Sequence, residues 1–545
     1  MKKHKYIHIG LMIALLFSVA SCKKELDVKN PNSPTPDQAK TETGIISLAT
    51  GGVYINGFQN GDSWLGDSYF SLPMGYHELL ADDVSAEAAN QNVNIVNVPD
   101  YVILDNGTKI STSSPQKSNL RINNARNKQS QNMFYYEWTN MYAMNNAINQ
   151  VLALVDDVHF SGDATTRKNT IKAWCYWWKG YAYAKIGSIY YAGLVNNTPN
   201  TLNPNYVNSA AIIAESDKNL SAAAAILGAI TSTSDYTTIM GELLPSMSQV
   251  GLGTVPTPAM FIHSINTMKA RNILANTRVS AMTATQWNAI LTLVTNGITS
   301  TDKVFTGRTN ESDINGWFSA GGGTVASLSA GDPASTTFKI SERLVQEFKT
   351  GDKRFTNNFA SSPYINQVGG FTFSSRWKLY DGIQKQSPLN GAIVLANSTP
   401  GAYELYLAGT YEENELMKAE ALIYLGQIDL GLASIDLVRN AQGAGLAAVS
   451  GTGLTLAAAK EELRRERRVA LVFRGTAFYD ARRWGVIDDV SKGGGRTNAV
   501  VYTAAGVLNT KATINYNFLD YFDVPADEFV LNPPAAGSAA IVNPN

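Results

Sequence analysis

The segment KEELRRERRVALVFRG (460–475), followed by FYDARRWG (478–485), decides the fold of this chain. The first part contains no proline and no internal glycine, so it predicts a helix that ends at the glycine. Glu461, Glu462 and Glu466 alternate with the basic residues and allow pairs four positions apart, on a solvated or interhelical face. Because the basic charges are matched in this way, the segment does not predict nucleic-acid binding.

The composition of the whole chain points in the same direction. Its 545 residues contain 44 Lys and Arg against 45 Asp and Glu, for a net charge of −1. A protein that binds nucleic acid by charge needs a clustered basic face, which this balance does not favour. Hydrophobic residues make up 44% and aromatic residues 10%. This content is enough for a large core, so it excludes wholesale disorder.

Several stretches upstream of the segment have helical periodicity and occur in adjacent pairs. Short polar links join the members of each pair, which predicts antiparallel helical hairpins. Ala419, Ala421, Gly426 and Gly431 are small residues where the last pair must approach closely, and this pattern resembles a tetratricopeptide repeat. A stack of about four hairpins is expected, with an irregular helical bundle as the alternative. The expected helices span 133–155 with 166–191, 259–279 with 285–296, and 411–425 with 430–440.

Long segments rich in Asn, Ser, Thr and Gly separate the helical pairs. Residues 84–130 and 301–405 are expected to form irregular loops with short strand-like pieces. Large aromatic residues outside regular elements favour surface recognition over core packing. The competing interpretation is loop packing. The candidate ligand-binding residues are Trp317, Trp64, Trp377, Tyr380 and Tyr101, whereas the helical Trp138, Trp174, Trp177, Trp178 and Trp287 are expected in the core.

The N-terminus has the layout of an export signal. Lys2, Lys3 and Lys5 precede a short apolar run, and Val19-Ala20-Ser21-Cys22 resembles the lipobox of bacterial lipoproteins. We expect residues 1–21 to be a lipoprotein signal peptide, with a plain signal peptide as the alternative. Cys22 is the predicted lipidation site, and the proline-containing residues 22–38 form the tether. Residues 39–545 are expected to form a single domain.

The remaining chemistry in the sequence is sparse. Cys22 is predicted to carry lipid, so Cys175 would be the one cysteine left and a disulfide within the mature chain is not expected. Cys175 is expected to be a buried apolar residue. The histidines lack metal-ligand spacing, and neither a metal site nor a cofactor is predicted. The acidic doublets Asp82-Asp83 and Asp156-Asp157 are expected to be solvated rather than to face each other as glycosidase acids do.

The C-terminal segment closely resembles the signature of the SusD/RagB family. The resemblance rests on Glu466-Arg467-Arg468, Leu471, Phe473 and Gly475, then Asp480, Arg482, Arg483, Trp484 and Gly485. Residues 26–29 and the closing 524–528 with Asn532-Pro533 are also similar to that family. The chain departs from the pattern at Ala470 and Arg474, where the family usually has Glu, at Ala477, where it has Arg, and at Ala481, where it has Leu.

The resemblance implies a mainly α fold, with about four tetratricopeptide-like hairpins on one side and irregular loops on the other. It also implies a lipid-anchored protein at the surface of the outer membrane, which captures oligosaccharide or peptide. Its partner would be a SusC-like TonB-dependent transporter. The signature is expected to lock the last helices together and not to bind ligand. A non-enzymatic role is expected, and a scaffold for protein partners or a secreted glycosidase are the alternatives.

Overall fold

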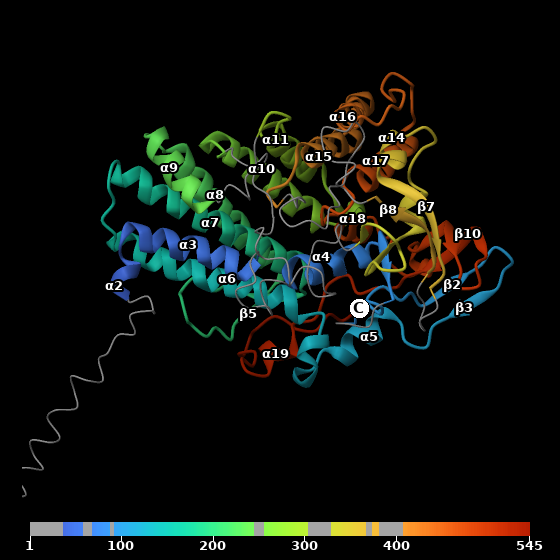
Figure 1. Cartoon of the computed structure of the whole chain (residues 1–545), viewed down its shortest axis with the longest axis horizontal. Coiled ribbons are helices and arrows are strands. Elements are labelled where there is room, and N and C mark those ends of the chain that lie inside the picture. The colour runs from blue at the N-terminus through green and yellow to red at the C-terminus, as the bar shows by residue number, and fades with distance from the viewer. Residues whose placement is uncertain are drawn as a thin grey trace, which may run out of the picture.

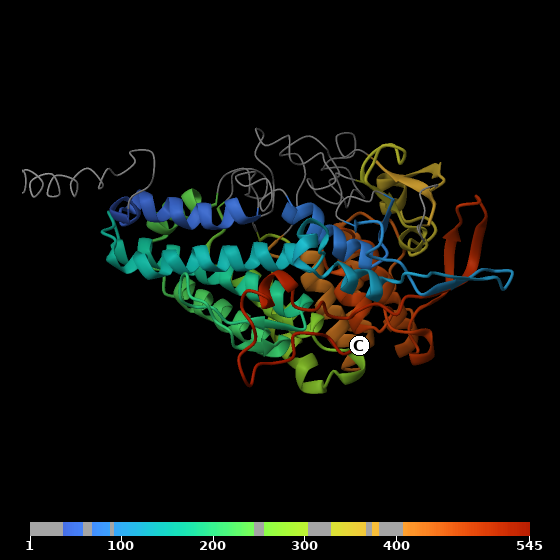
Figure 2. The ribbon, with the colours of Figure 1, turned by 90° about the horizontal axis from the view of Figure 1, so that it is seen from below.

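A computed structural model describes residues 36–57, 68–87, 92–244, 255–302, 329–366, 373–380 and 407–545. The predicted signal peptide, Cys22 and most of the tether lie outside the described residues, as do Trp64 and Trp317. The molecule is mainly helical, as expected. One end is formed by helices such as α7, α8 and α9, and most strands lie at the other end, where α14 and α17 lie beside them (Figures 1 and 2).

Most long helices form one continuous stack in which neighbours in the chain pack together. Contacts run from α3 to α6, α7, α8, α10, α11, α15, α16 and α17. The three predicted helix pairs correspond to α6 with α7, α10 with α11 and α15 with α16, so these hairpins are confirmed. The bounds are α3 (Glu42–Gly57), α6 (Tyr135–Leu154), α7 (Ala164–Ile189), α8 (Ser209–Gly228), α10 (Pro258–Ala275), α11 (Ala284–Thr295), α15 (Tyr411–Tyr424), α16 (Ile428–Ala441) and α17 (Leu456–Ala470).

Local sequence explains where these helices begin. The Asp163 side chain accepts hydrogen bonds from the backbone N–H groups of Thr165 and Thr166 and so caps α7. Thr283 and Gln286 form a reciprocal capping box at the start of α11. These side chains satisfy backbone donors that the first helical turn leaves without partners.

Glycine permits the closest helix contacts. A Cβ on Gly180 of α7 would lie 2.6 Å from Leu220 Cγ of α8. A Cβ on Gly431 of α16 would lie 2.7 Å from the Ala419 carbonyl oxygen of α15. Gly431 therefore acts as the sequence predicted, as a small residue where two helices approach.

Five further helices do not follow from the apolar pattern alone. In α8 the buried face includes Ser216, Asn219 and Ala223 beside its larger apolar residues, so its hydrophobic periodicity is weak. The Ser216 hydroxyl donates to the Gly180 carbonyl at 2.6 Å, which makes burial of this polar side chain favourable. The α-helices of eight or more residues that are absent from the prediction are α3, α4 (Ser68–Leu80), α5 (Gln116–Asn123), α8 and α9 (Thr233–Leu243).

The segments predicted as loops supply much of the strand-rich end. An antiparallel sheet has the order β3-β2-β10-β9, with bounds β2 (Tyr101–Ile103), β3 (Lys109–Ser111), β9 (Arg496–Tyr502) and β10 (Leu508–Asn515). Two-stranded sheets pair β1 (Val84–Ala86) with β6 (Phe338–Ile340), β7 (Phe359–Tyr364) with β8 (Ser375–Leu379), and β4 (Ala192–Leu194) with β5 (Tyr206–Asn208). Short helices are α2 (Pro36–Ala39), α13 (Glu342–Val345), α14 (Lys353–Asn358), α18 (Ala477–Arg483) and α19 (Ala526–Phe529).

Aromatic residues of α7 lie at the centre of the core. Trp174, Trp177 and Trp178 are at most 1% exposed, and the rings of Trp177 and Trp178 are 4.8 Å apart. Cys175 is fully buried among them, and burial raises the pKa of its thiol. Trp138 and Trp287 are buried too, so the prediction for all five helical tryptophans is confirmed. Within the described residues, no helix has the length and apolarity that crossing a membrane requires.

Candidate functional site

Several charged side chains of the signature helix α17 are buried in the interior. Glu466 is 1% exposed and accepts from two arginines of other elements. Both terminal nitrogens of Arg354 in α14 donate hydrogen bonds to the Glu466 carboxylate, one of them at 3.3 Å. The Nε of Arg439 in α16 donates to the same carboxylate at 2.8 Å. Arg354 also pairs with Asp352 at 2.8 Å. The carboxylate of Glu466 therefore joins three helices through charge-assisted hydrogen bonds.

A second group of paired charges joins α17 to α18 and α15. Asp480 accepts from Arg467 Nε at 2.8 Å and from Arg483 Nε at 2.7 Å. Arg483 also donates Nη2 to Glu420 of α15 at 2.7 Å. Although burial alone would raise it, these guanidinium groups hold the pKa of the Asp480 carboxyl below its usual value.

Arg482 ties the same segment to the helical stack through backbone oxygens. It donates to the carbonyl of Ser188 at 2.6 Å, just before the end of α7, and to the carbonyl of Ala275 at 2.8 Å, at the end of α10. Carbonyls at helix C-termini lack intrahelical partners and attract cations. The side chain of Arg482 therefore fastens two helix ends to the signature.

The doublet Asp82-Asp83 corrects an expectation, because both residues are buried rather than solvated. Arg343 binds Asp82 through Nε at 2.8 Å and Nη2 at 2.7 Å, and Arg468 lies 2.7 Å from Asp83. The expectation of solvated carboxylates rested on the local sequence alone. The arginines that bind them come from distant segments of the chain. Asp156 and Asp157 are about 60% exposed, as predicted.

Most signature charges pair with other elements and not within α17, although Arg464 and Glu461 do pair three residues apart at 2.7 Å. Arg464 also binds Glu347 at 2.8 Å, and the Arg483 guanidinium lies 4.3 Å from the centre of the Trp484 ring. These contacts confirm the predicted locking role. We call the paired charges around Glu466, Asp480 and Glu347 the signature network.

The predicted ligand-binding aromatics that the structure describes lie in or beside strands. Trp377 of β8 donates its indole N–H to Glu342 at 3.1 Å, and its ring is 5.0 Å from that of Phe355. Tyr380 follows the same strand. Tyr101 belongs to a different sheet, where the ammonium of Lys109 lies 3.8 Å above its ring. The structure therefore places Trp377 in β8 and Tyr380 directly after it, and Tyr101 in a different sheet.

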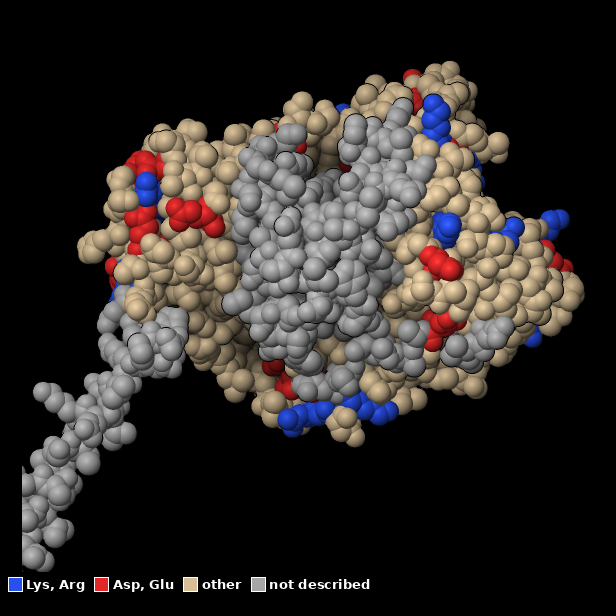
Figure 3. Space-filling model, viewed as in Figure 1, with Lys and Arg blue, Asp and Glu red and all other residues tan. Residues whose placement is uncertain are grey.

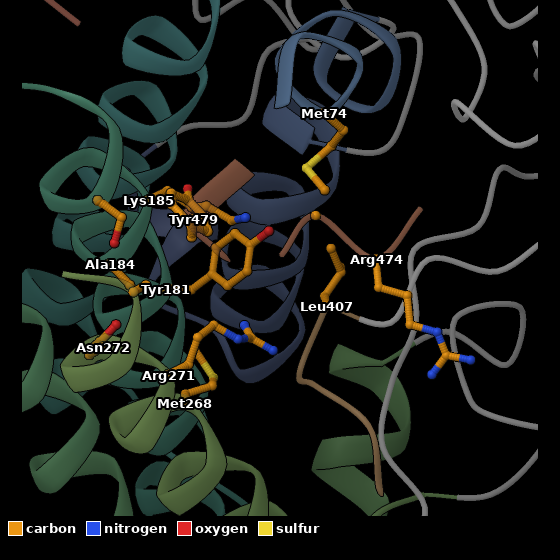
Figure 4. A pocket seen from close by; sticks show the side chains of 13 residues that line it. Met74, Tyr181, Ala184, Lys185, Met268, Arg271, Asn272, Leu407, Arg474 and Tyr479 are labelled. Carbon is orange, nitrogen blue, oxygen red and sulfur yellow. The ribbon is translucent and has the colours of Figure 1, made fainter. Parts of the chain in front are cut away.

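A pocket outside this predicted set opens between α7, α10 and the signature. The two helices each supply residues at spacings of three, four and seven, which form one face of a helix. Figure 4 shows Lys185, Tyr181 and Arg271 pointing toward one another, whereas the Arg474 guanidinium points away. The lining consists of Tyr181, Ala184, Lys185 and Ser188 of α7, Met268, Arg271, Asn272 and Ala275 of α10, and Met74, Leu407, Arg474, Gly475 and Tyr479.

Among the residues that the structure describes, three cations and no carboxylate line this pocket. Arg271 forms a bidentate pair with Glu413, and Arg474 binds Glu412 at 3.0 Å. The third cation, Lys185, is partly exposed, and desolvation lowers the pKa of its ammonium. We call this cavity the Lys185 pocket.

Sequence reasoning did not find the pocket, because its residues come from five distant parts of the chain. Lys185 lies in a helix rich in apolar residues and resembles an ordinary surface lysine. The one signal was Arg474, which stands where the SusD/RagB signature usually has Glu. On the described part of the face in Figure 3, charges of both signs occur and most of the surface is uncharged. This distribution also gives no support to nucleic-acid binding.

Comparison with known proteins identifies the fold. Residues 407–533, which contain the signature network's central helices, match the model of the SusD family. The chain has a SusD-like fold. No curated protein sequence matches it significantly.

Solved structures that share this fold cover nearly the whole chain. A SusD-like carbohydrate-binding protein from Bacteroides vulgatus is 12% identical over 92% of this chain and 99% of its own, with a TM-score of 0.57. A SusD superfamily protein from the same species is 18% identical over 90% and 97%, with a TM-score of 0.51. A structure with xylogluco-oligosaccharide is 15% identical over 92% and 99%, with a TM-score of 0.54. The SusD-like fold therefore extends well beyond the matched C-terminal region.

Proposed function

We propose that this SusD-like chain captures oligosaccharide at the cell surface and delivers it to a SusC-like TonB-dependent transporter in the outer membrane. The observation that carries the proposal is the near-complete structural match to SusD-like proteins, one of them described as carbohydrate-binding and another solved with an oligosaccharide. In this proposal the protein is attached to the membrane by lipid on Cys22. Peptide is the second class of ligand that the resemblance allows.

The architecture suits capture followed by transfer. The helical stack is held by packed aromatics and the signature network, and it offers a rigid surface for a protein partner. Sugar binding requires aromatic faces together with polar groups for the hydroxyls. Trp377, Tyr380 and Tyr101 are candidates for the stacking faces, and Trp64 and Trp317 remain sequence-based candidates.

We propose a binding role without catalysis. Hydrolysis of a glycoside needs two carboxyl groups on either side of the bond. The buried doublet Asp82-Asp83 is engaged by Arg343 and Arg468, and Asp156 pairs with Lys172 at 2.8 Å on the surface. Both acidic doublets therefore already have structural partners, which favours binding over glycosidase activity.

The test is to isolate the tagged full-length chain from solubilised outer membranes of its own host. A TonB-dependent transporter should copurify in near-equal amount, and cells that lack the chain should take up less of the oligosaccharide. Cys22→Ala should release the protein from the membrane without changing its helical circular dichroism spectrum. Purification without a transporter, together with unchanged uptake in the deletion strain, would contradict the proposal.

A further inference from the structure

A second cavity lies beside the last residues of the chain, and it is larger than the Lys185 pocket. It leaves about 180 Å³ for the centres of water-sized groups, against about 30 Å³ in the Lys185 pocket. One water needs roughly 10 to 15 Å³ by the same measure, so the larger cavity has room for one hexose ring with its hydroxyl groups. We call it the Asn517 pocket. Its charged lining residues are Lys117, Arg278, Asp488, Asp489, Lys492 and Asp520.

The charges around the Asn517 pocket balance one another. Among the described residues, its lining has three cationic and three anionic side chains. Arg278 binds Asp488 through two hydrogen bonds of 2.9 and 3.0 Å, and its Nη2 lies 3.5 Å from Asp520. Because these side chains give the pocket no excess charge of either sign, its selectivity must come from hydrogen bonding and not from attraction of an ion.

Two ammonium groups of the pocket have donors that the described residues leave unused. Lys117 of α5 donates to Asn517 Oδ1 at 2.9 Å, which occupies one of its three N–H groups. Lys492 is exposed and makes no hydrogen bond or ion pair within the described part of the chain. Burial and the charge of Lys492 lower the pKa of Lys117, while Asp100 and Asp520 act on it in the opposite direction.

Hydrogen-bond acceptors stand beside these donors. Asp489 accepts from the Ser491 N–H at 2.8 Å and from Asn515 Nδ2 at 2.9 Å. These hydrogen bonds lower the pKa of Asp489 to about 2, so its carboxylate is an acceptor at neutral pH. A carboxylate has about four lone-pair sites and can therefore accept further hydrogen bonds. Asp489 and Asn517 are both half-buried, so solvent reaches them.

A ligand in the Asn517 pocket thus meets donors and acceptors together. A hydroxyl group both donates and accepts, so neighbouring hydroxyls of a sugar suit this lining. A zwitterionic peptide end suits it less well, because Arg278 already occupies Asp488 and would have to be displaced.

We infer that the Asn517 pocket binds one neutral sugar unit, with Lys117 and Lys492 donating to its hydroxyls and Asp489 accepting from them. This inference rests on the proposed capture of oligosaccharide and deepens it by adding a site without an exposed aromatic ring.

The Asn517 pocket is distinct from the strand that carries Trp377. In Figure 2 the C-terminus, where Asn545 lines the pocket, lies away from the yellow strands β7 and β8. The pocket lies nearer to the sheet of Tyr101, because Asn517 Nδ2 donates to Asp100 at 2.7 Å. Loss of sugar contacts at Trp377 would therefore leave this site in place.

The test locates the bound sugar by lysine acetylation. Neutral oligosaccharides of glucose, galactose, mannose and xylose would be titrated calorimetrically into the full-length chain in detergent. The chain would then be acetylated briefly with and without an oligosaccharide that binds, and mass spectrometry would identify the reacted lysines. At about ten times the dissociation constant, acetylation of Lys117 and Lys492 should slow about ten-fold, because little of the pocket is then free. Lys218, whose side chain is 71% exposed on α8, should react unchanged.

One double variant and a matched control assign the binding to these donors. Lys117→Met combined with Lys492→Met should weaken binding of the same oligosaccharide about five-fold or more, because charged hydrogen bonds to its hydroxyls are lost. Lys218→Met should bind it as wild type does. Circular dichroism and urea unfolding would confirm that the variants remain folded, and the acetylation experiment uses the wild-type chain in any case.

Binding of an oligosaccharide without protection of Lys117 and Lys492 would overturn the inference and leave the proposed capture function intact. Protection by triglycine, and not by any neutral oligosaccharide, would overturn the assignment to a sugar. Absence of binding by all the neutral oligosaccharides would also overturn it, and if in addition no transporter copurified, the proposed function itself would fail.

Discussion

The signature network and the Lys185 pocket adjoin in α18, where Tyr479 lines the pocket and Asp480 belongs to the network, yet their charges are paired differently. In the network, Glu466 binds two arginines and Asp480 binds two more, all of them buried. In the pocket, Lys185 makes no ion pair among the described residues, and only the more distant charges of Glu137, Glu413 and Glu78 act on it. The difference teaches that this protein places charges in two kinds of environment. Closely paired charges hold helices together, whereas Lys185 contributes no such link.

The largest expected effect comes from breaking the network at its centre. Glu466→Gln should lower the free energy of unfolding by about 3 kcal/mol, because it removes the buried carboxylate that Arg354 and Arg439 share and leaves them only Asp352 and Glu462 as partners. Urea unfolding of the purified protein measures this loss. Glu461→Gln is the control, since the Glu461 side chain is 54% exposed and its pair with Arg464 is a surface pair. The control should change stability by less than about 1 kcal/mol.

The next effect is the acid sensitivity of Glu347. Its ion pairs with Arg464 and Arg496 outweigh its burial and lower the pKa of its carboxyl to about 2. The folded state therefore binds the proton more weakly than the unfolded state. The stabilisation is fully present above the ordinary Glu pKa, and it is lost as the pH falls toward 2.

Unfolding measured across this pH range should show wild-type stability decreasing on acidification by about 3 kcal/mol more than that of Glu347→Gln. Identical pH slopes for the two proteins would contradict the ion-paired state of Glu347.

A smaller effect of opposite sign is expected at Glu78. This residue of α4 is buried beside Asp83 and accepts the Gly475 N–H at 3.1 Å. Burial and the neighbouring carboxyl raise the pKa of Glu78 well above its usual value. Its stabilising contribution is therefore full below the ordinary Glu pKa and is lost as the pH rises through the folded-state value.

Glu78→Gln keeps the acceptor for Gly475 and removes the titration. The variant should match wild type in acid and become the more stable protein as the pH rises toward neutrality. If the variant were the less stable protein at neutral pH, Glu78 would be a compensated anion like Glu466.

The smallest stability effect should come from Lys185. Desolvation lowers the pKa of its ammonium, so folding disfavours the proton there. Stability should increase in wild type relative to Lys185→Met as the pH approaches the ordinary lysine pKa, and the variant should be no less stable at neutral pH. Marked destabilisation of Lys185→Met at neutral pH would show that Lys185 belongs to the structural network.

Sequence reasoning succeeded where the information was local. The hairpins of α10 with α11 and α15 with α16 follow from periodicity, caps and turn glycines such as Gly426, whose φ is +82°. The locking role of the signature followed from family resemblance. Helix α8 was missed because Ser216 and Asn219 stand at buried positions.

The site was harder to predict because its chemistry depends on distant partners. Asp82 looks like a solvated acid until α13 brings Arg343 to it. Lys185 and Tyr479 are separated by nearly three hundred residues, and only the packing of α18 against α10 and α7 unites them in one pocket. Aromatic residues such as Trp377 were likewise predicted to lie in loops, but pairing between distant strands places them in sheets.

The most direct test of the central claim is calorimetric titration of the purified full-length chain with oligosaccharides, followed by chromatography of the same mixtures. The account predicts binding with dissociation constants on the order of micromolar to millimolar and full recovery of uncleaved ligand after prolonged incubation. Release of shorter sugars by rigorously purified protein would contradict it, because the chain would then be an enzyme and not a capture protein.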